Sequence, residues 1–298
     1  MRSRESFEAE CAIAQAAAVV GDWWTLLILR DVAGGINRFD EVQAELAISR
    51  KVLSERLAGL VSDGVLERRL YRSRPPRYEY HLTASGRGLI PVLIALQDWG
   101  SRFVLGDGTV TATGGPRSKE AQRMRKLVGT DLPSVELAAS DGTSRDPLGE
   151  AEWTVVYCYP GAYAADSAPR GWSEIPGATG CTLEATTFRD RLAAFTLRGA
   201  EVVGVSTQPS EEQAAFAAKA RIPYRLLSDQ GLQLAAALRL PTFRAGGRDH
   251  LKRLTLIVSA DREIRHVLYP IPDPVASIEQ ALTLLDRAGA RPTSPAGT

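Results

Sequence analysis

Apolar residues recur at helical spacing through much of the first hundred residues. Residues 11–20 form an alanine-rich run, and residues 23–32 and 39–46 carry apolar side chains three or four positions apart. Ser49 is a good N-cap for the next helix, whose valines and leucines share one face. Because glycine readily adopts the left-handed conformation of a helix C-terminus, this helix is expected to end at Gly64.

Two segments with alternating polarity follow, at residues 65–71 and 78–82, and they predict a two-stranded hairpin. Residues 83–103 again favour a helix. Helices followed by a hairpin and a closing helix are typical of a winged helix-turn-helix. We therefore expect an α+β winged helix-turn-helix domain over residues 1–105.

From residue 127 onward, the pattern predicts strands that alternate with helices. A nearly continuous apolar run at residues 153–159 is typical of a strand that is buried on both faces. A helix, a strand, two helices, two strands and a final helix are expected after it, at residues 183–198, 201–206, 210–221, 232–240, 253–259, 264–269 and 275–286. This order fits an α/β thioredoxin-like domain over residues 127–288.

The stretch between the two patterned regions has a different character. Residues 106–126 are rich in glycine and threonine and show no amphipathic period, which predicts a flexible linker. Only three of the 17 prolines precede residue 106, and this shift in composition supports a domain boundary there. Residues 289–298 are expected to form a flexible tail.

The composition excludes several classes of protein. Hydrophobic residues make up 44% of the chain and charged residues 24%, as in globular proteins. The apolar runs are far shorter than the roughly 20 residues of a membrane span, and no signal peptide is evident, so we expect a cytoplasmic protein without a membrane partner. Three cysteines are too few for a disulfide framework, and neither they nor the three dispersed histidines have the spacing of a metal site; no cofactor is predicted.

Positive charge lies where a winged helix-turn-helix meets DNA. The second helix of the motif enters the major groove by its N-terminal residues, which here are Ser49, Arg50, Lys51, Ser54 and Arg56. Residues 66–77 of the hairpin hold five arginines and one acid, which suits phosphate and minor-groove contacts by Arg72, Arg74 and Arg77. A charge run is more often a solvated surface, but its position beside this motif predicts binding to double-stranded DNA.

The first domain also resembles the HxlR-type branch of winged-helix transcriptional regulators. The resemblance rests on a cysteine that opens the first helix and on the segments GDWWTLLILR at 21–30, RF at 38–39, SRKVLSERL at 49–57, PPRYEYHLT at 75–83, GR at 86–87 and WG at 99–100. It implies a homodimer, paired through its terminal helices, on an inverted-repeat operator. It also implies that Cys11 can sense oxidants; the alternative is a small, buried apolar residue.

Cys181 lies between a loop rich in glycine and proline and the start of a predicted helix. The positive end of a helix dipole favours a thiolate, which is the species that attacks the O–O bond of a peroxide to give a sulfenic acid. On this local context alone, an inert loop cysteine is the alternative.

The segments around Cys181 resemble a peroxiredoxin of the AhpC/TSA superfamily, in its PrxQ-like branch. They are LPSVEL at 132–137, VVYCYP at 155–160, GCTLEA at 180–185, GVS at 204–206, LLSD at 226–229 and KRLTLI at 252–257. The resemblance implies that Cys181 is the peroxidatic nucleophile and that Arg253 holds the thiolate and the peroxide oxygens. Ala178 occupies the position of the family's threonine, so Thr179 can supply that hydroxyl only if the loop is reshaped.

The sequence departs from the family in two further ways. Twenty residues separate Pro160 from Cys181, which is a long loop for this superfamily. The resolving cysteine expected five residues after Cys181 is Thr186, and Cys158 is expected in the core. A thiol reductant from outside, or a cysteine elsewhere such as Cys11, would have to resolve the oxidised residue.

We interpret the chain as a redox-responsive DNA-binding transcriptional regulator that senses or reduces peroxide through Cys181. Oxidation would unfold the first turn of the helix after Cys181 and change the spacing of the two DNA-binding units in the dimer. One alternative is a one-cysteine thiol peroxidase with a tethered DNA-binding domain. Another is a regulator whose degenerate peroxiredoxin domain serves only for dimerisation.

Overall fold

The computed structural model describes residues 10–163 and 167–289. By its internal contacts the chain divides into two compact units, Met1–Ile94 and Ala95–Thr298, which are described separately below. Except for Gly289, the tail predicted at residues 289–298 lies outside the described residues.

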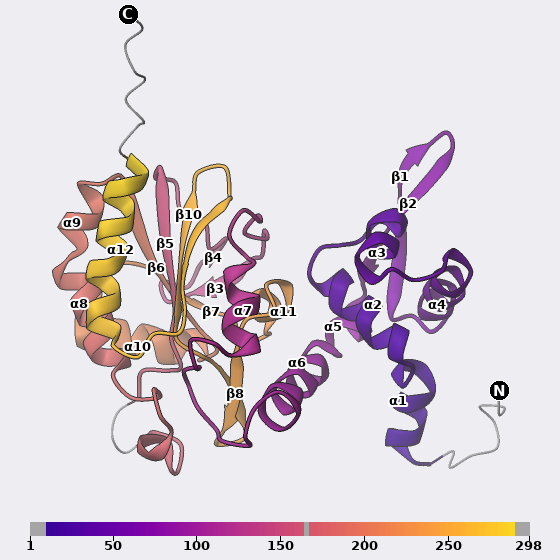
Figure 1. Ribbon diagram of the computed structural model, residues 1–298, viewed down its shortest axis with the longest axis horizontal. Helices are drawn as coiled ribbons and strands as arrows, with labels where there is room; N and C mark the ends of the chain where they lie inside the picture. Colours follow the sequence, from indigo (N-terminus) through magenta and orange to yellow (C-terminus); the bar gives the residue numbers. More distant parts are fainter. Residues whose placement is uncertain (1–9, 164–166, 290–298) are drawn as a thin grey trace, which may run out of the picture. The chain divides into compact units, whose positions relative to one another are not determined.

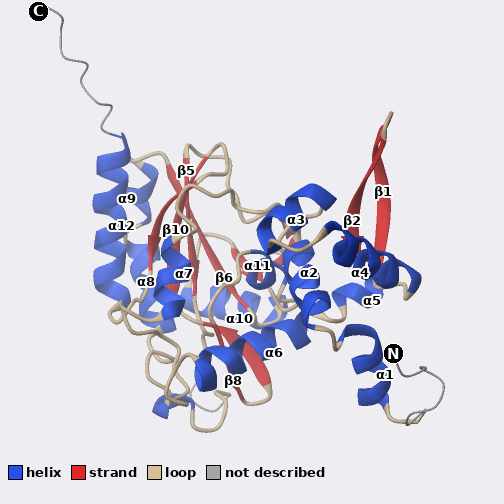
Figure 2. Cartoon of the chain, turned by 45° about the vertical axis from the view of Figure 1, so that its right-hand side comes forward, coloured by secondary structure: helices blue, strands red, loops and turns tan. Residues whose placement is uncertain are grey.

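The first unit is a winged helix-turn-helix, as predicted (Figure 1). Its elements are α1 Ala12–Val20, α2 Trp23–Ala33, α3 Phe39–Leu46, α4 Arg50–Ser62, β1 Leu66–Ser73, β2 Pro76–Leu82 and α5 Ala84–Arg87. Ile28 of α2, Val42 of α3 and Leu53 and Leu57 of α4 are buried together in its core. The antiparallel hairpin β1–β2 projects beyond these helices in Figure 2 and pairs Leu66 with Leu82 at its base.

The closing helix predicted at residues 83–103 is interrupted. The chain forms α5, then α6 Ile90–Trp99, and then a π-helical turn at Gly100–Val104. Gly88 follows α5, and glycine weakens a helix interior because its backbone has the most freedom to lose. Pro91 stands at the second position of α6, where a missing amide hydrogen costs no helical hydrogen bond.

The second unit is a thioredoxin-like α/β domain with a mixed seven-stranded sheet in the order β11-β10-β5-β6-β7-β3-β4. Strands β5, β6 and β7 are parallel, and β10 runs antiparallel to both β5 and β11. The strands are β3 Leu137–Ala139, β4 Ser144–Arg145, β5 Trp153–Cys158, β6 Ala200–Ser206, β7 Leu226–Ser228, β10 Leu254–Ser259 and β11 Ile264–Leu268, with a separate hairpin of β8 Thr242–Ala245 and β9 Arg248–Leu251. The short strands β3, β4, β7, β8 and β9 were not predicted from the sequence.

Helices cover both faces of this sheet. They are α7 Lys119–Arg125, α8 Cys181–Asp190, α9 Leu192–Thr196, α10 Ser210–Ala220, α11 Gln233–Ala237 and α12 Pro274–Gly289. Figure 1 shows α8, α9 and α12 on one side of the strands. Tyr157 of β5 packs there against Phe188 of α8, with ring centroids 4.4 Å apart, and Cys181 belongs to the same core. Since side chains alternate along a strand, Cys158 faces the other side.

Residues 106–126 differ from the predicted flexible linker. They belong to the second unit, contain α7, and bury Ala112, Ala121 and Met124. Their small residues are needed for close packing: a Cβ atom on Gly114 would lie 2.5 Å from the hydroxyl oxygen of Tyr269. The composition typical of a linker therefore serves here to fit the chain tightly against the sheet domain.

Among the described residues, no single helix is long and apolar enough to cross a membrane. Helices α1 and α2 pass that test of length and composition only as a pair, and the pair is bent by 76°.

Candidate functional site

Cys181 is the first residue of α8, and the loop before it sets its position. Gly180 has φ of +96°, a conformation that a side chain would strain, and its carbonyl accepts a hydrogen bond from the amide of Glu184. This turn directs the thiol inward, and only 4% of the Cys181 surface is exposed. The Sγ atom donates to the carbonyl oxygen of Ala178 over 3.5 Å.

The guanidinium of Arg253 lies directly beside this sulfur. Arg253 precedes β10 at the end of the sheet where β10 pairs with Cys158, the last residue of β5. It is among the largest fully buried residues of the protein, at 1% exposure. Its Nη2 donates to Cys181 Sγ over 3.3 Å, to the Thr179 carbonyl over 3.1 Å and to the Gly177 carbonyl over 3.4 Å. The arginine therefore holds both the thiol and the loop that carries it.

Glu184 completes the site, and the sequence reasoning missed it. It is fully buried one turn after Cys181 on α8, and its Oε2 accepts a hydrogen bond from Arg253 Nη1. Its Oε1 has no hydrogen-bond partner in the described part of the chain. A buried arginine needs such a counter-charge. The signal in the sequence is an acid three residues after the cysteine, on the face of the helix that is otherwise apolar.

Thr179 lies in the loop directly before Gly180 and Cys181. Its side chain is exposed, and within the described residues its hydroxyl makes no hydrogen bond, whereas its carbonyl accepts from Arg253. A cavity of about 950 Å³ opens beside Cys181 and is lined in part by Thr179, Thr182 and Tyr163. Thr182, in the first turn of α8, is thus a second hydroxyl that borders the thiol cavity.

The long loop before Cys181 packs around His250 of β9. The ring of Trp172 lies 4.9 Å from the His250 ring, and Tyr163 and Phe243 complete an aromatic cluster. Burial lowers the pKa of His250, whose Nδ1 is 3.1 Å from the Pro160 carbonyl. Burial also raises the pKa of Tyr163 to about 12, so this tyrosine stays protonated at neutral pH. The described parts of the loop thus form an apolar wall of the thiol cavity.

The remaining cysteines lie elsewhere. Cys158 is fully buried on the opposite face of β5, and burial raises the pKa of its thiol. Thr186, at the position of a resolving cysteine, donates its hydroxyl to the Thr182 carbonyl over 2.9 Å. Cys11, the N-cap residue of α1 in the first unit, is partly exposed, and all three cysteines are free. No group of metal-binding side chains occurs among the described residues.

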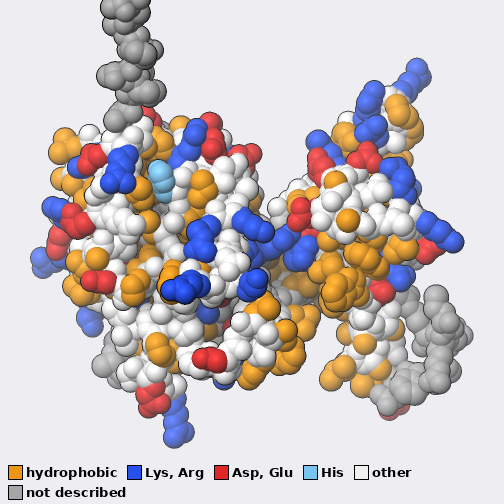
Figure 3. Space-filling view, in the orientation of Figure 1, with side chains coloured by type: hydrophobic (Ala, Val, Ile, Leu, Met, Phe, Trp, Pro, Cys, Tyr) orange, Lys and Arg blue, Asp and Glu red, His pale blue; other side chains and the backbone are white. Residues whose placement is uncertain are grey.

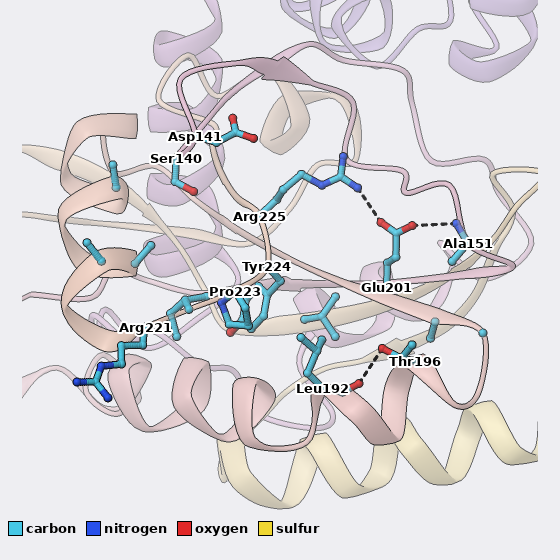
Figure 4. Close-up of a pocket in the computed structure, with 17 residues that line it drawn as sticks. Ser140, Asp141, Ala151, Leu192, Thr196, Glu201, Arg221, Pro223, Tyr224 and Arg225 are labelled. Atoms are coloured by element: carbon cyan, nitrogen blue, oxygen red, sulfur yellow. Dashed lines mark hydrogen bonds and ion pairs between the residues drawn. The ribbon is translucent and has the colours of Figure 1, made fainter.

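A second cavity of about 890 Å³ lies beside α9, α10 and β6 and contains no thiol (Figure 4). One of its two carboxylates, Glu201, pairs with Arg225 over 2.7 Å and accepts a hydrogen bond from the Ala151 amide; the other is Asp141. Arg221 extends away from this pair. The Glu201 carboxylate is therefore already paired in this cavity, which contains no thiol, and the thiol cavity is the stronger candidate for chemistry.

In the first unit, the predicted DNA-contacting residues surround the start of α4 and the hairpin. Figure 3 shows Lys and Arg side chains at the hairpin tip. Asp40 of α3 lies between two of these residues: it is 3.3 Å from Arg50 and 3.4 Å from Arg77. The three residues line a cavity of about 310 Å³ between α4 and the hairpin. Asp40 thus fixes the start of the predicted recognition helix relative to the wing.

The other predicted contacts divide into exposed and structural residues. Lys51, Ser54 and Arg74 are exposed, and Arg72 donates to the Arg74 carbonyl over 3.1 Å. Arg56 makes two hydrogen bonds to Asp22, the N-cap of α2, at 2.8 and 3.1 Å, and Ser49 caps α4 by accepting from the Val52 amide. The structure therefore confirms the predicted N-cap role of Ser49 and gives Arg56 an internal role that the sequence did not indicate.

Comparison with known proteins finds a different family in each part of the chain. A family model described as HxlR-like helix-turn-helix matches residues 19–106, and one described as the AhpC/TSA family matches residues 175–267. An uncharacterised HTH-type transcriptional regulator of Mycobacterium tuberculosis (strain ATCC 25618 / H37Rv) is 42% identical over 98 residues, which are 33% of this chain and 61% of the relative. The chain thus spans about three fifths of the length of this relative.

Two further similarities concern the second unit. The chloroplastic peroxiredoxin Q of Suaeda salsa is 31% identical over 172 residues, which are 57% of this chain and 73% of that protein. The crystal structure of peroxidoxin BcpB from Mycobacterium tuberculosis superposes with a TM-score of 0.46 at 30% identity and covers 55% of this chain and 98% of its own.

Proposed function

Since the chain belongs to the HxlR-like helix-turn-helix family in its first part and to the AhpC/TSA peroxiredoxin family in its second, we propose that it is a redox-responsive transcriptional regulator. Peroxide reacts with Cys181, and the oxidised second unit changes how the first unit binds DNA. One observation carries the proposal: a buried arginine donates a hydrogen bond to a buried thiol beside a cavity.

The chemistry follows from that arrangement. The Cys181 thiolate attacks one oxygen of the peroxide, an S–O bond forms as the O–O bond breaks, and sulfur is oxidised by two electrons to a sulfenic acid. The leaving alkoxide or hydroxide takes up a proton to give an alcohol or water. Negative charge moves from the Cys181 sulfur to the departing oxygen during this step. Nη2 of the Arg253 guanidinium lies 3.3 Å from that sulfur. A preorganised donor of this kind stabilises the transition state without reorganising.

Glu184 has a positioning role in this scheme. Its carboxylate holds Nη1 of Arg253, which leaves Nη2 directed at Cys181 and at the carbonyls of Gly177 and Thr179. A hydroxyl that orients the peroxide comes from Thr179 or Thr182, both of which line the cavity.

The DNA-binding part of the proposal places the start of α4 in the major groove and the arginines of the β1–β2 hairpin on phosphates. We propose a homodimer on an inverted-repeat operator. The exposed apolar side chains of Leu96, Trp99 and Phe103 in α6 and the turn after it support an additional interface. The free thiols fit a reducing cytoplasm, where DNA is also available.

Mass spectrometry of the intact protein during peroxide titration tests the reactive residue. One equivalent of peroxide should add a single oxygen at Cys181, trapped by a sulfenic acid reagent, in both the parent protein and a Cys11→Ser variant. The Cys181→Ser variant should trap none. Labelling of Cys11 in place of Cys181 would contradict the proposal.

The cavity beside Cys181 also favours a second candidate function, that of a one-cysteine thiol peroxidase. This activity needs an external thiol to reduce the sulfenic acid in every cycle, since Thr186 replaces the resolving cysteine. Steady consumption of many equivalents of peroxide with dithiothreitol would establish turnover. Consumption of only one equivalent of peroxide would exclude turnover and support a sensor.

A further inference from the structure

We propose that residues 109–114, here called the connector strap, position Arg253 and the thiol loop, residues 175–180, and that the strap is released when this loop opens. The inference rests on the proposed function only in taking Cys181 as a residue that becomes modified. It assigns a role to the segment that the sequence predicted to be a linker.

Hydrogen bonds join the strap to both parts of the thiol site. The Ala112 amide donates to the Pro176 carbonyl over 2.8 Å, and the Thr111 hydroxyl donates to the same oxygen over 3.2 Å. The Ala112 carbonyl in turn accepts the backbone amide of Arg253 over 3.1 Å. One residue of the strap is thus bonded on one side to the loop before Cys181 and on the other to the arginine that contacts its sulfur.

Packing makes these contacts close. Ala112 is fully buried in one apolar cluster with Ala178, Trp172 and Phe243. A Cβ atom on Gly177 would lie 3.1 Å from the Cβ of Thr113, so a larger residue there would push the loop and the strap apart. Cys181 Sγ donates to the carbonyl of Ala178, and Ala178 packs in the same cluster as Ala112. Ala178 therefore lies between the sulfur and the strap.

Modification of Cys181 opposes this closed arrangement. The sulfur is held by Arg253 and the Ala178 carbonyl in a residue that is 4% exposed, so a second thiol reaches it only when residues 175–180 move. That movement displaces the Pro176 carbonyl, which is the acceptor of the Ala112 amide and one of the two carbonyl acceptors of the Thr111 hydroxyl. A bulky adduct on Cys181 keeps the loop open and therefore favours the released strap.

The strap is continuous with the helix that leads out of the first unit. The Arg102 guanidinium donates to the carbonyl of Gly108, the residue directly before the strap, and the Gln97 side chain of α6 donates to the Leu240 carbonyl over 2.8 Å. Release of residues 109–114 therefore frees the chain next to Gly108, to which Arg102 of the turn after α6 is bonded. The backbone thus links the strap, beside the thiol site, directly to α6, which begins in the DNA-binding unit.

Hydrogen exchange in the full chain tests the release. A Cys11→Ser protein is treated with oxidised glutathione, whose disulfide bond breaks as the Cys181 thiolate forms a mixed disulfide and expels a glutathione thiolate. Exchange of the Ala112 amide should then accelerate by about tenfold or more relative to the reduced protein, because its acceptor has moved. A Cys11→Ser/Cys181→Ser protein treated in the same way should not change. Unaltered exchange at Ala112 in the verified adduct would overturn the inference, and because no peroxide is used, this result is independent of the proposed function.

A reciprocal variant tests the positioning role. Thr111→Val removes a hydroxyl that reaches the Pro176 carbonyl of the loop and also bonds to the amide and carbonyl of Thr113 within the strap. Thr109→Val, on the same segment but exposed, is its matched control. Thr111→Val should speed alkylation of Cys181 by iodoacetamide by about threefold, because the loop opens more readily without this hydrogen bond, and should shift the midpoint of its pH profile. Thr109→Val should match the parent in both. Identical rates and pH profiles for Thr111→Val and the parent would contradict a positioning role for the strap.

Discussion

Arginine serves the two units in opposite ways. In the first unit, Arg72, Arg74 and Arg77 of the hairpin are exposed to solvent. In the second unit, Arg253 is almost completely buried and donates to a sulfur, a carboxylate and two carbonyls. Each arrangement suits a different partner.

Exposed arginines contribute mainly to a long-range field. Their attraction to phosphate falls with ionic strength and depends little on the exact position of each side chain. A buried guanidinium acts at short range in a medium where its interactions are strong, and it is useful only if its position is fixed. Substitutions should therefore have graded, salt-dependent effects in the hairpin and severe effects at Arg253.

The largest effect is expected from Arg253→Lys. Lysine keeps the charge but has a single donor group, which cannot serve Cys181, Glu184 and the loop carbonyls together. The rate constant for oxidation of Cys181 by peroxide should fall by about a hundredfold, as measured by stopped-flow fluorescence.

The Arg265→Lys variant is a matched control, because Arg265 is a partly exposed arginine of the same unit that pairs with Glu263. It should react like the parent. A normal rate for Arg253→Lys would show that the buried arginine does not assist the reaction.

A smaller effect is expected from the double variant Arg72→Ala/Arg74→Ala. If both side chains contact phosphates, the slope of log affinity against log salt concentration should decrease by about 2, and affinity should fall on every sequence tested. Fluorescence anisotropy with a random-sequence duplex measures this slope, and Arg191→Ala, on α8–α9 of the second unit, is the control. An unchanged slope would show that Arg72 and Arg74 of the hairpin do not contact DNA phosphates.

The smallest effect is expected from Asp22→Ala, which removes the N-cap of α2 and the partner of Arg56. Loss of a cap costs about 0.5–2 kcal/mol in the free energy of unfolding, measured by urea denaturation. Partial burial raises the pKa of Asp22, but hydrogen bonds from the Thr25 amide and from Arg56 outweigh it and hold the pKa below its ordinary value.

The sign of the pH dependence follows from that lowered pKa. The charged Asp22 stabilises the fold above the ordinary carboxyl pKa, and this contribution disappears as the pH falls through the lower pKa of the folded protein. The difference between the parent and Asp22→Ala should therefore shrink in acid, and Asp22→Asn should lie between them. A difference that grows below pH 4 would contradict the assigned pKa direction.

The sequence predicted the elements that have a strong period or a clear cap. The core helices of the first unit and strands β5, β6, β10 and β11 were found because their apolar residues repeat over five or more positions. Strands β3 and β7 have three residues each, and β4 has two, which is too short for a period to appear. Residues 106–126 were taken for a linker because small residues are typical both of flexible chain and of segments that pack closely.

Only the residues of the candidate site that belong to a motif were predicted from the sequence. Cys181 and Arg253 stand at positions that a motif marks, whereas their contact depends on the pairing of β10 with β5 and on residues 72 apart. Glu184 and Ala112 carry no motif, and their roles appear only when α8 and the strap are placed against Arg253. Arg56 resembled a DNA contact because spacing along α4 cannot show that Asp22 lies beside it.

The central claim is that the oxidation state of Cys181 sets the affinity of the protein for DNA. Its most direct test is the anisotropy of a labelled duplex, selected by the reduced protein from a random library, titrated with a Cys11→Ser protein before and after one equivalent of peroxide. We expect the dissociation constant to change by about tenfold or more, and to return after reduction. The Cys11→Ser/Cys181→Ser protein should bind equally under both conditions. Equal affinity of the reduced and the oxidised Cys11→Ser protein, with the sulfenic acid at Cys181 verified by mass, would contradict the account.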